Sequence, residues 1–133
     1  MPHFLSPMLR DPDAAWTLRV RARDQVIATR VEAAFDSTTR KRGLLGRDGL
    51  PRGTALVLAP CAAVHTLFMR FTIDVIYCDR EGRVLKTVAA LRPWRLSAVW
   101  WRGFATIEVA SGEANLPRIG DEIELAPQDL PRI

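Results

Sequence analysis

The chain has 133 residues, 48% of them hydrophobic, which predicts one compact domain with a buried core and excludes the need for a second domain. No apolar run approaches the ~20 residues that a membrane-spanning helix needs, so we expect no membrane partner. The formal net charge of +4 is weak evidence for an anionic partner, because only two of the 19 basic residues are lysines and a GC-rich genome would produce the same arginine bias.

The N-terminal segment, residues 1–13, contains three prolines and little periodicity, and we expect it to be a loosely ordered arm. It lacks the basic start, apolar centre and small-residue cleavage site of an export signal, which favours a cytoplasmic location. A single β domain is expected over residues 14–126, followed by a C-terminal tail over 127–133.

One short helix is predicted after the first strands. Asp36 or Ser37 can cap it, it is expected over residues 38–45, and Gly46 can end it in a left-handed conformation. A helix of one or two turns needs tertiary packing for its stability. We therefore expect it to dock against the strands.

Short segments with strand character make up most of the remaining chain. Residues 16–31 alternate on both sides of Arg23 and Asp24, which predicts two antiparallel strands joined by a turn. Further strands are expected at 55–59, 65–70, 73–79, 84–88, 104–110 and 121–125. Glycine and proline punctuate these segments, and the pattern predicts a mainly β fold: a compact single-domain β sandwich or open barrel with one short helix.

The stretch from Pro60 to Arg83 places a carboxylate, Asp74, among apolar neighbours. Burying that charge unpaired would cost several kcal/mol, so we expect a cationic or backbone N–H partner. Arg70 is the nearest candidate, and a buried Arg70–Asp74 pair is favoured over an Arg70 left free to clamp an anion. Glu108 raises the same question, although its ordinary interpretation is a solvent-facing strand position.

This stretch resembles the signature of the DUF192 (UPF0127) family. The resemblance extends from about Thr39 to Leu125, although Thr72 stands where many members have proline and Phe68 where others have tryptophan. It implies a compact, mostly β domain with no established biochemical activity. The residues that carry it are Phe68, Met69, Arg70, Ile73, Asp74, Asp79 and Gly82, then Arg42, Gly43, Leu44, Gly46 and Arg47, and finally Glu108, Gly112, Gly120 and Asp121.

An enzyme could use His65 as a general base, Asp74 to orient it and Cys61 as a nucleophile. No local motif of a cysteine hydrolase surrounds them, so the structural interpretation of all three is favoured. A metal could draw on the same residues with Cys78, but the spacing does not match structural zinc modules. We therefore predict neither a metal nor a cofactor, and two reduced core thiols rather than a disulfide.

The segment 91–104 contains three of the four tryptophans and is expected to be an ordered loop. Its aromatic and guanidinium groups fit three interpretations: indoles packed as a lid over the sheets, a surface for a small molecule or protein, or a platform for single-stranded nucleic acid. The modest net charge and the absence of a known nucleic-acid motif argue against the last. The residues concerned are Arg92, Trp94, Arg95, Trp100, Trp101 and Arg102.

Taken together, the residues favour a small binding or accessory module over an enzyme. The expected partner is a small anionic ligand or a protein. The alternatives are a hydrolase or metal-dependent enzyme using His65, Asp74 and Cys61, and a weak single-stranded nucleic-acid binder. The predicted ligand-binding residues are Arg70, Asp74, Trp94, Arg95 and Trp101.

Overall fold

The structure, a computed structural model, describes residues 2–112 and 115–128. Strands dominate these ranges, which confirms the mainly β prediction, and two short helices are present where one was expected. The elements in chain order are α1 (Ser6–Arg10), β1 (Trp16–Val20), β2 (Gln25–Ala28), β3 (Arg30–Ala34), α2 (Ser37–Arg42), β4 (Thr54–Leu58), β5 (Ala63–His65), β6 (Ile73–Cys78), β7 (Val84–Leu91), β8 (Leu96–Ala98), β9 (Ala105–Ala110) and β10 (Ile123–Pro127).

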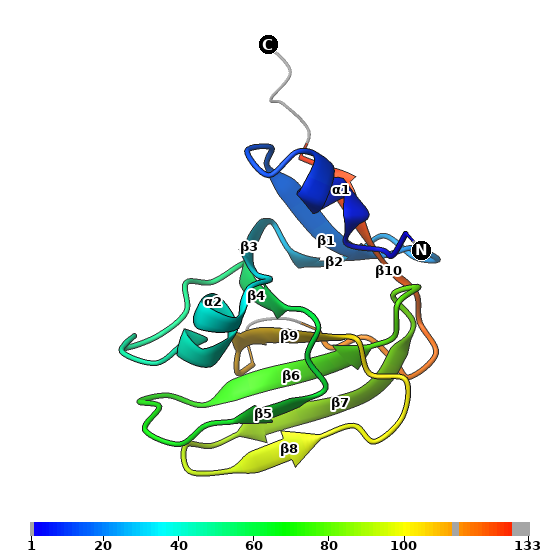
Figure 1. The fold of residues 1–133 in the computed structure, drawn as a ribbon. Coiled ribbons are helices and arrows are strands. Elements are labelled where there is room, and N and C mark those ends of the chain that lie inside the picture. The colour runs from blue at the N-terminus through cyan, green and yellow to red at the C-terminus, as the bar shows by residue number, and fades with distance from the viewer. Residues whose placement is uncertain (1, 113–114, 129–133) are drawn as a thin grey trace.

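The strands form three sheets (Figure 1). A five-stranded sheet has the order β3-β4-β9-β6-β7, a three-stranded sheet has the order β10-β1-β2, and β5 pairs with β8. The β3–β4 pair is parallel, whereas β4–β9, β9–β6 and β6–β7 are antiparallel. None of the described strands closes the sheets into a barrel, which agrees with the expected sandwich or open barrel.

The five-stranded sheet is covered on both faces. One face packs against the three-stranded sheet, and Val57, Ile107 and Leu18 belong to the core that the two sheets share. The other packs beneath α2, its following loop and the β5–β8 pair, with Tyr77 and Leu44 in a second core. Strands covered on both sides read as nearly continuous apolar runs. This explains why every residue of β4 and β6, including the charged Asp74, is buried.

The N-terminal segment is docked, contrary to the expected loose arm. Leu5 is fully buried and Met8 is 7% exposed, both within the core between the two larger sheets. The N–H of Phe4 also donates to the carbonyl of Arg80 at 2.9 Å. The expectation was wrong because the prolines and aspartates around Leu5 and Met8 interrupt the apolar pattern by which a buried segment is recognised. The predicted tail, 127–133, lies mostly outside the described residues.

The helix α2 is shorter than the predicted 38–45. Asp36 caps it as expected, because its carboxylate accepts the N–H of Thr39 at 2.8 Å. Gly43 ends it with φ of 47°, a left-handed value that favours glycine. Among the described residues, no helix has the length and apolar character needed to cross a membrane.

Two segments differ from their predicted elements. The strand expected from His65 to Arg70 ends at His65, and Phe68 beyond it has φ of 66°. The loop expected over 91–104 contains β8, which pairs with β5 and aligns His65 with Leu96. This pairing joins segments about 30 residues apart in the chain, so local sequence patterns carried no signal for it.

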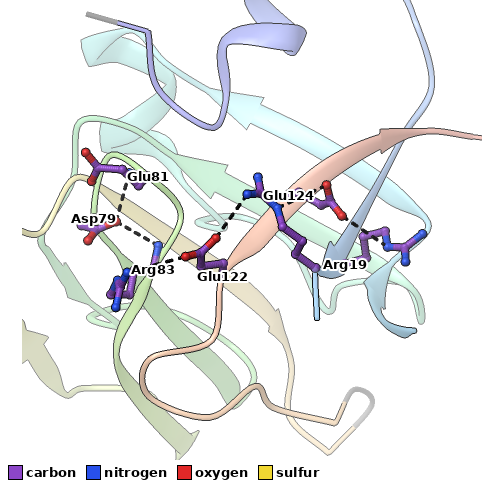
Figure 2. A network of polar contacts seen from close by, with 7 residues as sticks. Arg19, Asp79, Glu81, Arg83, Glu122 and Glu124 are labelled. Atoms are coloured by element: carbon purple, nitrogen blue, oxygen red, sulfur yellow. Dashed lines mark hydrogen bonds and ion pairs between the residues drawn. The ribbon is translucent and has the colours of Figure 1, made fainter. Parts of the chain in front are cut away.

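Charged groups on the three-stranded sheet neutralise one another (Figure 2). Arg19 lies 3.8 Å from Glu124, and Arg83 lies 3.6 Å from Glu122. The nearby carboxylate of Asp79 accepts the backbone N–H of Glu81 at 3.0 Å, within the predicted turn, and that of Arg83 at 2.9 Å, directly after it. The guanidinium groups of Arg19 and Arg83 therefore each face a carboxylate.

Candidate functional site

Asp74 is satisfied by backbone amides, and the predicted Arg70–Asp74 pair is wrong. Its side chain is only 4% exposed, and its two oxygens accept the N–H of Ala90 at 2.8 Å and that of Gly112 at 3.2 Å. The guanidinium of Arg70 instead donates to Asp48 at 2.7 Å on the surface. Asp74 thus ties β6 to the end of β7 and to the turn after β9, which is a structural role.

His65 and Cys61 meet at a small cavity, but Asp74 does not. The cavity has a volume of about 80 Å³ and lies between the end of α2, β5 and β9; among the described residues that line it, Glu108 alone carries a carboxylate. The thiol of Cys61 donates to the carbonyl of Ala63 at 3.1 Å. Nowhere in residues 2–112 and 115–128 do three or more His, Cys, Asp or Glu side chains gather closely enough to hold a metal.

Glu108 is the unexpected member of this cavity. It lies on β9, opposite Leu56 of β4 and Val75 of β6, and it is 4% exposed. The solvent-facing interpretation is therefore wrong. Its carboxylate makes no hydrogen bond or ion pair of standard geometry with any described residue. Burial raises the pKa of Glu108 to about 7, and the charge of Arg47 opposes this rise.

Three further groups shape the surroundings of the carboxyl group. Gly43 passes so close that a Cβ built there would lie 4.0 Å from Oε1 of Glu108. Tyr77 is fully buried on the same face of the sheet; burial raises its pKa, and the proximity of Cys61 and Glu108 raises it further. The hydroxyl of Tyr77 lies near that of Ser97 without meeting the geometry of a hydrogen bond.

The two cysteines differ in access, and neither is in a disulfide. Cys61 is partly exposed and borders the cavity, whereas Cys78 is fully buried in the core. Burial raises the pKa of Cys78 far above that of an ordinary thiol. Cys61 is therefore the thiol that a reagent in solution can reach.

A second candidate site is an exposed surface around β8, which we call the aromatic-basic face. The side chains of Trp100 and Trp101 are 97% and 66% exposed, so the lid interpretation is wrong. The face comprises Phe68, Lys86, Arg92, Trp94, Arg95, Leu96, Trp100, Trp101 and Arg102. Lys86, Leu96 and Trp100 of this face line one groove together, and large exposed apolar patches mark interaction sites.

Thr66 holds two loops of this face together. It is fully buried, its hydroxyl donates to the carbonyl of Arg92 at 2.6 Å, and the same oxygen accepts the N–H of Arg95 at 2.9 Å. The arrangement brings the rings of Phe68 and Trp94 to 4.7 Å. Both ring-bearing residues have φ of 66°, a conformation that costs energy and is often found at functional sites.

An open groove of about 800 Å³ lies beside this face and is lined by residues of β5, β7 and β8. Its walls are mostly apolar. Lys86 borders it and donates to the carbonyl of Ala98 at 2.8 Å. The apolar lining consists of Ala63, Val64, Val88, Leu91, Leu96, Ala98 and Trp100.

Charge is distributed unevenly over the chain. Residues 60–73 and 84–107, which build the face and the groove, contain five of the 19 basic residues and none of the 15 acidic ones. The remaining residues, with 14 basic and 15 acidic side chains, carry one net negative charge. Within the described ranges, no carboxylate pairs with Lys86, Arg92, Arg95 or Arg102. The positive charge of the protein is therefore concentrated beside its exposed tryptophans.

The predicted ligand-binding residues separate into two groups. Trp94, Arg95 and Trp101 belong to the aromatic-basic face. Arg70 follows Phe68 closely in the chain but directs its charge to Asp48, and Asp74 is enclosed at the start of β6. A cleft formed by all five is not what the structure contains.

Comparison with known proteins gives a family and a fold. The DUF192 model, described as "Uncharacterized ACR, COG1430", matches residues 18–125. The UPF0127 protein PH1112 of Pyrococcus horikoshii is 38% identical over 65 residues, which cover 47% of this chain and 56% of that protein. The matched region therefore spans little more than half the length of this curated relative.

Two solved structures share the fold. A protein of unknown function from Novosphingobium aromaticivorans DSM 12444 superimposes with a TM-score of 0.70 at 21% identity, covering 83% of each chain. A structure described as a "putative transcription regulator" from Sinorhizobium meliloti 1021 superimposes with a TM-score of 0.66 at 15% identity, covering 84% of this chain and 92% of the other. At these identities, the likeness concerns the fold alone.

Proposed function

The chain belongs to the DUF192 family, and from this premise we propose that it is a small binding module whose aromatic-basic face takes an acidic, apolar segment of a protein partner. The observation that carries the proposal is the combination of an apolar groove, exposed indoles and basic residues without neighbouring acids. Tryptophan and arginine are the residues that most often anchor protein interfaces. Complementary charge would steer the partner to this face.

An extended segment fits the strands that border the groove. β7 is the last strand of the five-stranded sheet, and β8 pairs only with β5 among the described strands. Each therefore has one edge at which backbone groups can pair with an added strand. In an extended segment, alternate side chains face opposite sides. Apolar side chains would enter the groove while acidic ones approach Arg92, Arg95 and Arg102.

A tryptophan fluorescence titration tests this function. The probes are three synthetic eight-residue peptides in which leucine alternates with glutamate, glutamine or lysine. Three of the four tryptophans lie on the face, so binding should change the emission in a saturable way. We expect the glutamate peptide to bind at least tenfold more tightly than the glutamine and lysine peptides. Its affinity should fall as salt is added.

Matched variants locate the binding surface. Leu96 and Ile119 are 76% and 71% exposed, but only Leu96 borders the groove. Leu96→Ala should lower the affinity for the glutamate peptide about tenfold, because it removes an anchor of the interface. Ile119→Ala should leave this affinity unchanged. Arg95→Gln should likewise weaken binding and Arg10→Gln should not. Equal effects within each pair would contradict the proposal.

A single-stranded nucleic acid is the competing occupant, because bases also stack on exposed indoles beside arginine. Titration with an oligothymidylate of about 12 residues decides between the two. Saturable binding of the oligonucleotide, with no binding of the glutamate peptide, would contradict the proposed protein partner and indicate a nucleic-acid-binding function. The enzyme alternative has less support, because the Asp74 carboxylate that it requires is occupied by backbone amides.

A further inference from the structure

The cavity beneath α2 contains a buried acid to which no described residue donates a hydrogen bond. Glu108 is 96% buried and lies against a void of about 80 Å³, yet no described residue hydrogen-bonds to it. Buried polar side chains are normally paired, because an unmade hydrogen bond costs free energy. A void of this size is several times the ~10–15 Å³ needed for one water. It can therefore accept a small molecule at the unpartnered carboxyl group.

The groups around the cavity define the chemistry of such a molecule. The walls are apolar, formed by Leu44, Leu58 and Met69, with Leu45 and Val64 beside them. The polar lining is basic, from Arg40, Lys41 and Arg42 at the end of α2, and His65 stands on β5. A cationic ligand would be repelled by this rim. An anion with a short aliphatic part would complement both the walls and the rim.

We propose that the cavity is a binding site for a small aliphatic carboxylate, to which the neutral Glu108 carboxyl group donates its proton while the basic residues of α2 balance the ligand's charge. Glu108 and the bound carboxylate then share one proton in a hydrogen bond. Their facing oxygen atoms therefore do not repel each other. Lys41 and Arg42 are exposed and contribute mainly long-range attraction. The apolar walls limit the ligand to a short chain.

The ionisation of Glu108 supports this arrangement. With a pKa of about 7, the side chain is neutral in roughly half of the molecules at pH 7 and can act as a donor. The titratable or charged groups facing it are Arg47 from the loop after α2, Tyr77 from β6, Cys61, and His65 from β5, together with the basic rim. Carboxylate binding should therefore draw about half a proton from the buffer at pH 7.

Calorimetric titration with sodium propionate tests the proposal, with propylammonium chloride and propionamide as charge-reversed and neutral controls. We expect propionate alone to bind, about tenfold more tightly at pH 6 than at pH 8, because the neutral fraction of Glu108 changes by about that factor. Glu108→Gln keeps an N–H donor and should bind propionate with a weaker pH dependence than wild type between these values, because the Glu108 contribution is removed. Glu108→Leu should abolish binding.

A second pair of variants avoids changes in the core. Lys41→Gln combined with Arg42→Gln alters only exposed rim residues and should lower the affinity for propionate severalfold. Arg10→Gln should leave this affinity unchanged. The proposal is overturned if propionate fails to bind, if propylammonium binds instead and tightens as pH rises, or if wild-type binding is independent of pH. Leu96→Ala should leave propionate binding unchanged, so this site and the aromatic-basic face are tested separately.

Discussion

The replacement Glu108→Gln should make the protein more stable at high pH, because it removes a carboxylate that burial keeps from ionising. The pKa of Glu108 rises from 4.5 to about 7 on folding, and each unit corresponds to about 1.4 kcal/mol. Below pH 4.5 the group is protonated in both the folded and unfolded states and costs nothing. Between about pH 4.5 and 7 the unfolded state loses this proton while the folded state keeps it, so stability falls over this window and levels off above pH 7; the linkage relation gives a loss of about 2–3 kcal/mol between pH 5 and 8, most of it below pH 7.

Urea unfolding at pH 5, 6, 7 and 8 measures this effect in wild type, Glu108→Gln and Glu81→Gln. Glu81 is an exposed carboxylate and controls for the loss of one charge. Contributions from other titrating groups cancel in the difference between wild type and variant. We expect the free energy of unfolding of Glu108→Gln, relative to wild type, to increase by about 2–3 kcal/mol from pH 5 to 8. A constant difference over this range would refute the reasoning about burial.

Three further outcomes follow from the contacts described. Asp74→Asn should lower the free energy of unfolding by about 1–3 kcal/mol, because one backbone N–H loses its acceptor, whereas the exposed Arg70→Ala should change it by less than about 1 kcal/mol. In the double variant, the two changes in the free energy of unfolding should add. A large coupling energy would instead be evidence for an Arg70–Asp74 pair. Leu5→Ala should cost about 2–5 kcal/mol by the same measurement, since α1 docks through this side chain; no effect would indicate a loose arm. A thiol reagent should modify Cys61 in the native protein and Cys78 only after unfolding, so two reactive thiols under native conditions would contradict the described burial.

For Asp74, the sequence predicted that the carboxylate has a partner but not which groups are the partners. The need for a partner followed from one carboxylate in an apolar strand, and the backbone N–H alternative was correct. The identity of the donors was not predictable, because Ala90 and Gly112 come from 16 and 38 residues further along the chain. Arg70 was near in sequence but pairs with Asp48 across the surface.

Glu108 shows a different limit. Strand periodicity places it on the face opposite Ile107 and Val109, but periodicity does not say whether that face is covered. Its burial depends on α2 and the following loop, whose docking is a tertiary event. The mainly β class was predictable because many short strands share a local signature. The burial of α1 and the β5–β8 pair depended on long-range contacts and was missed.

The aromatic-basic face was found from composition, because three tryptophans and three arginines fall within a dozen residues of the chain. Its exposure could not be predicted, since the same residues could have packed as a lid. Hydrogen bonds between the Thr66 hydroxyl and backbone groups of Arg92 and Arg95 hold the loops in place, and the indoles remain outside the core.

Amide chemical-shift mapping with the alternating leucine–glutamate peptide is the most direct test of the proposed function. We predict that the largest changes fall within residues 63–68 and 84–102, with residues of β1 and β10 unaffected. Changes concentrated on the three-stranded sheet, or no changes at a peptide concentration that saturates the fluorescence signal, would contradict the assignment of this face as the binding surface.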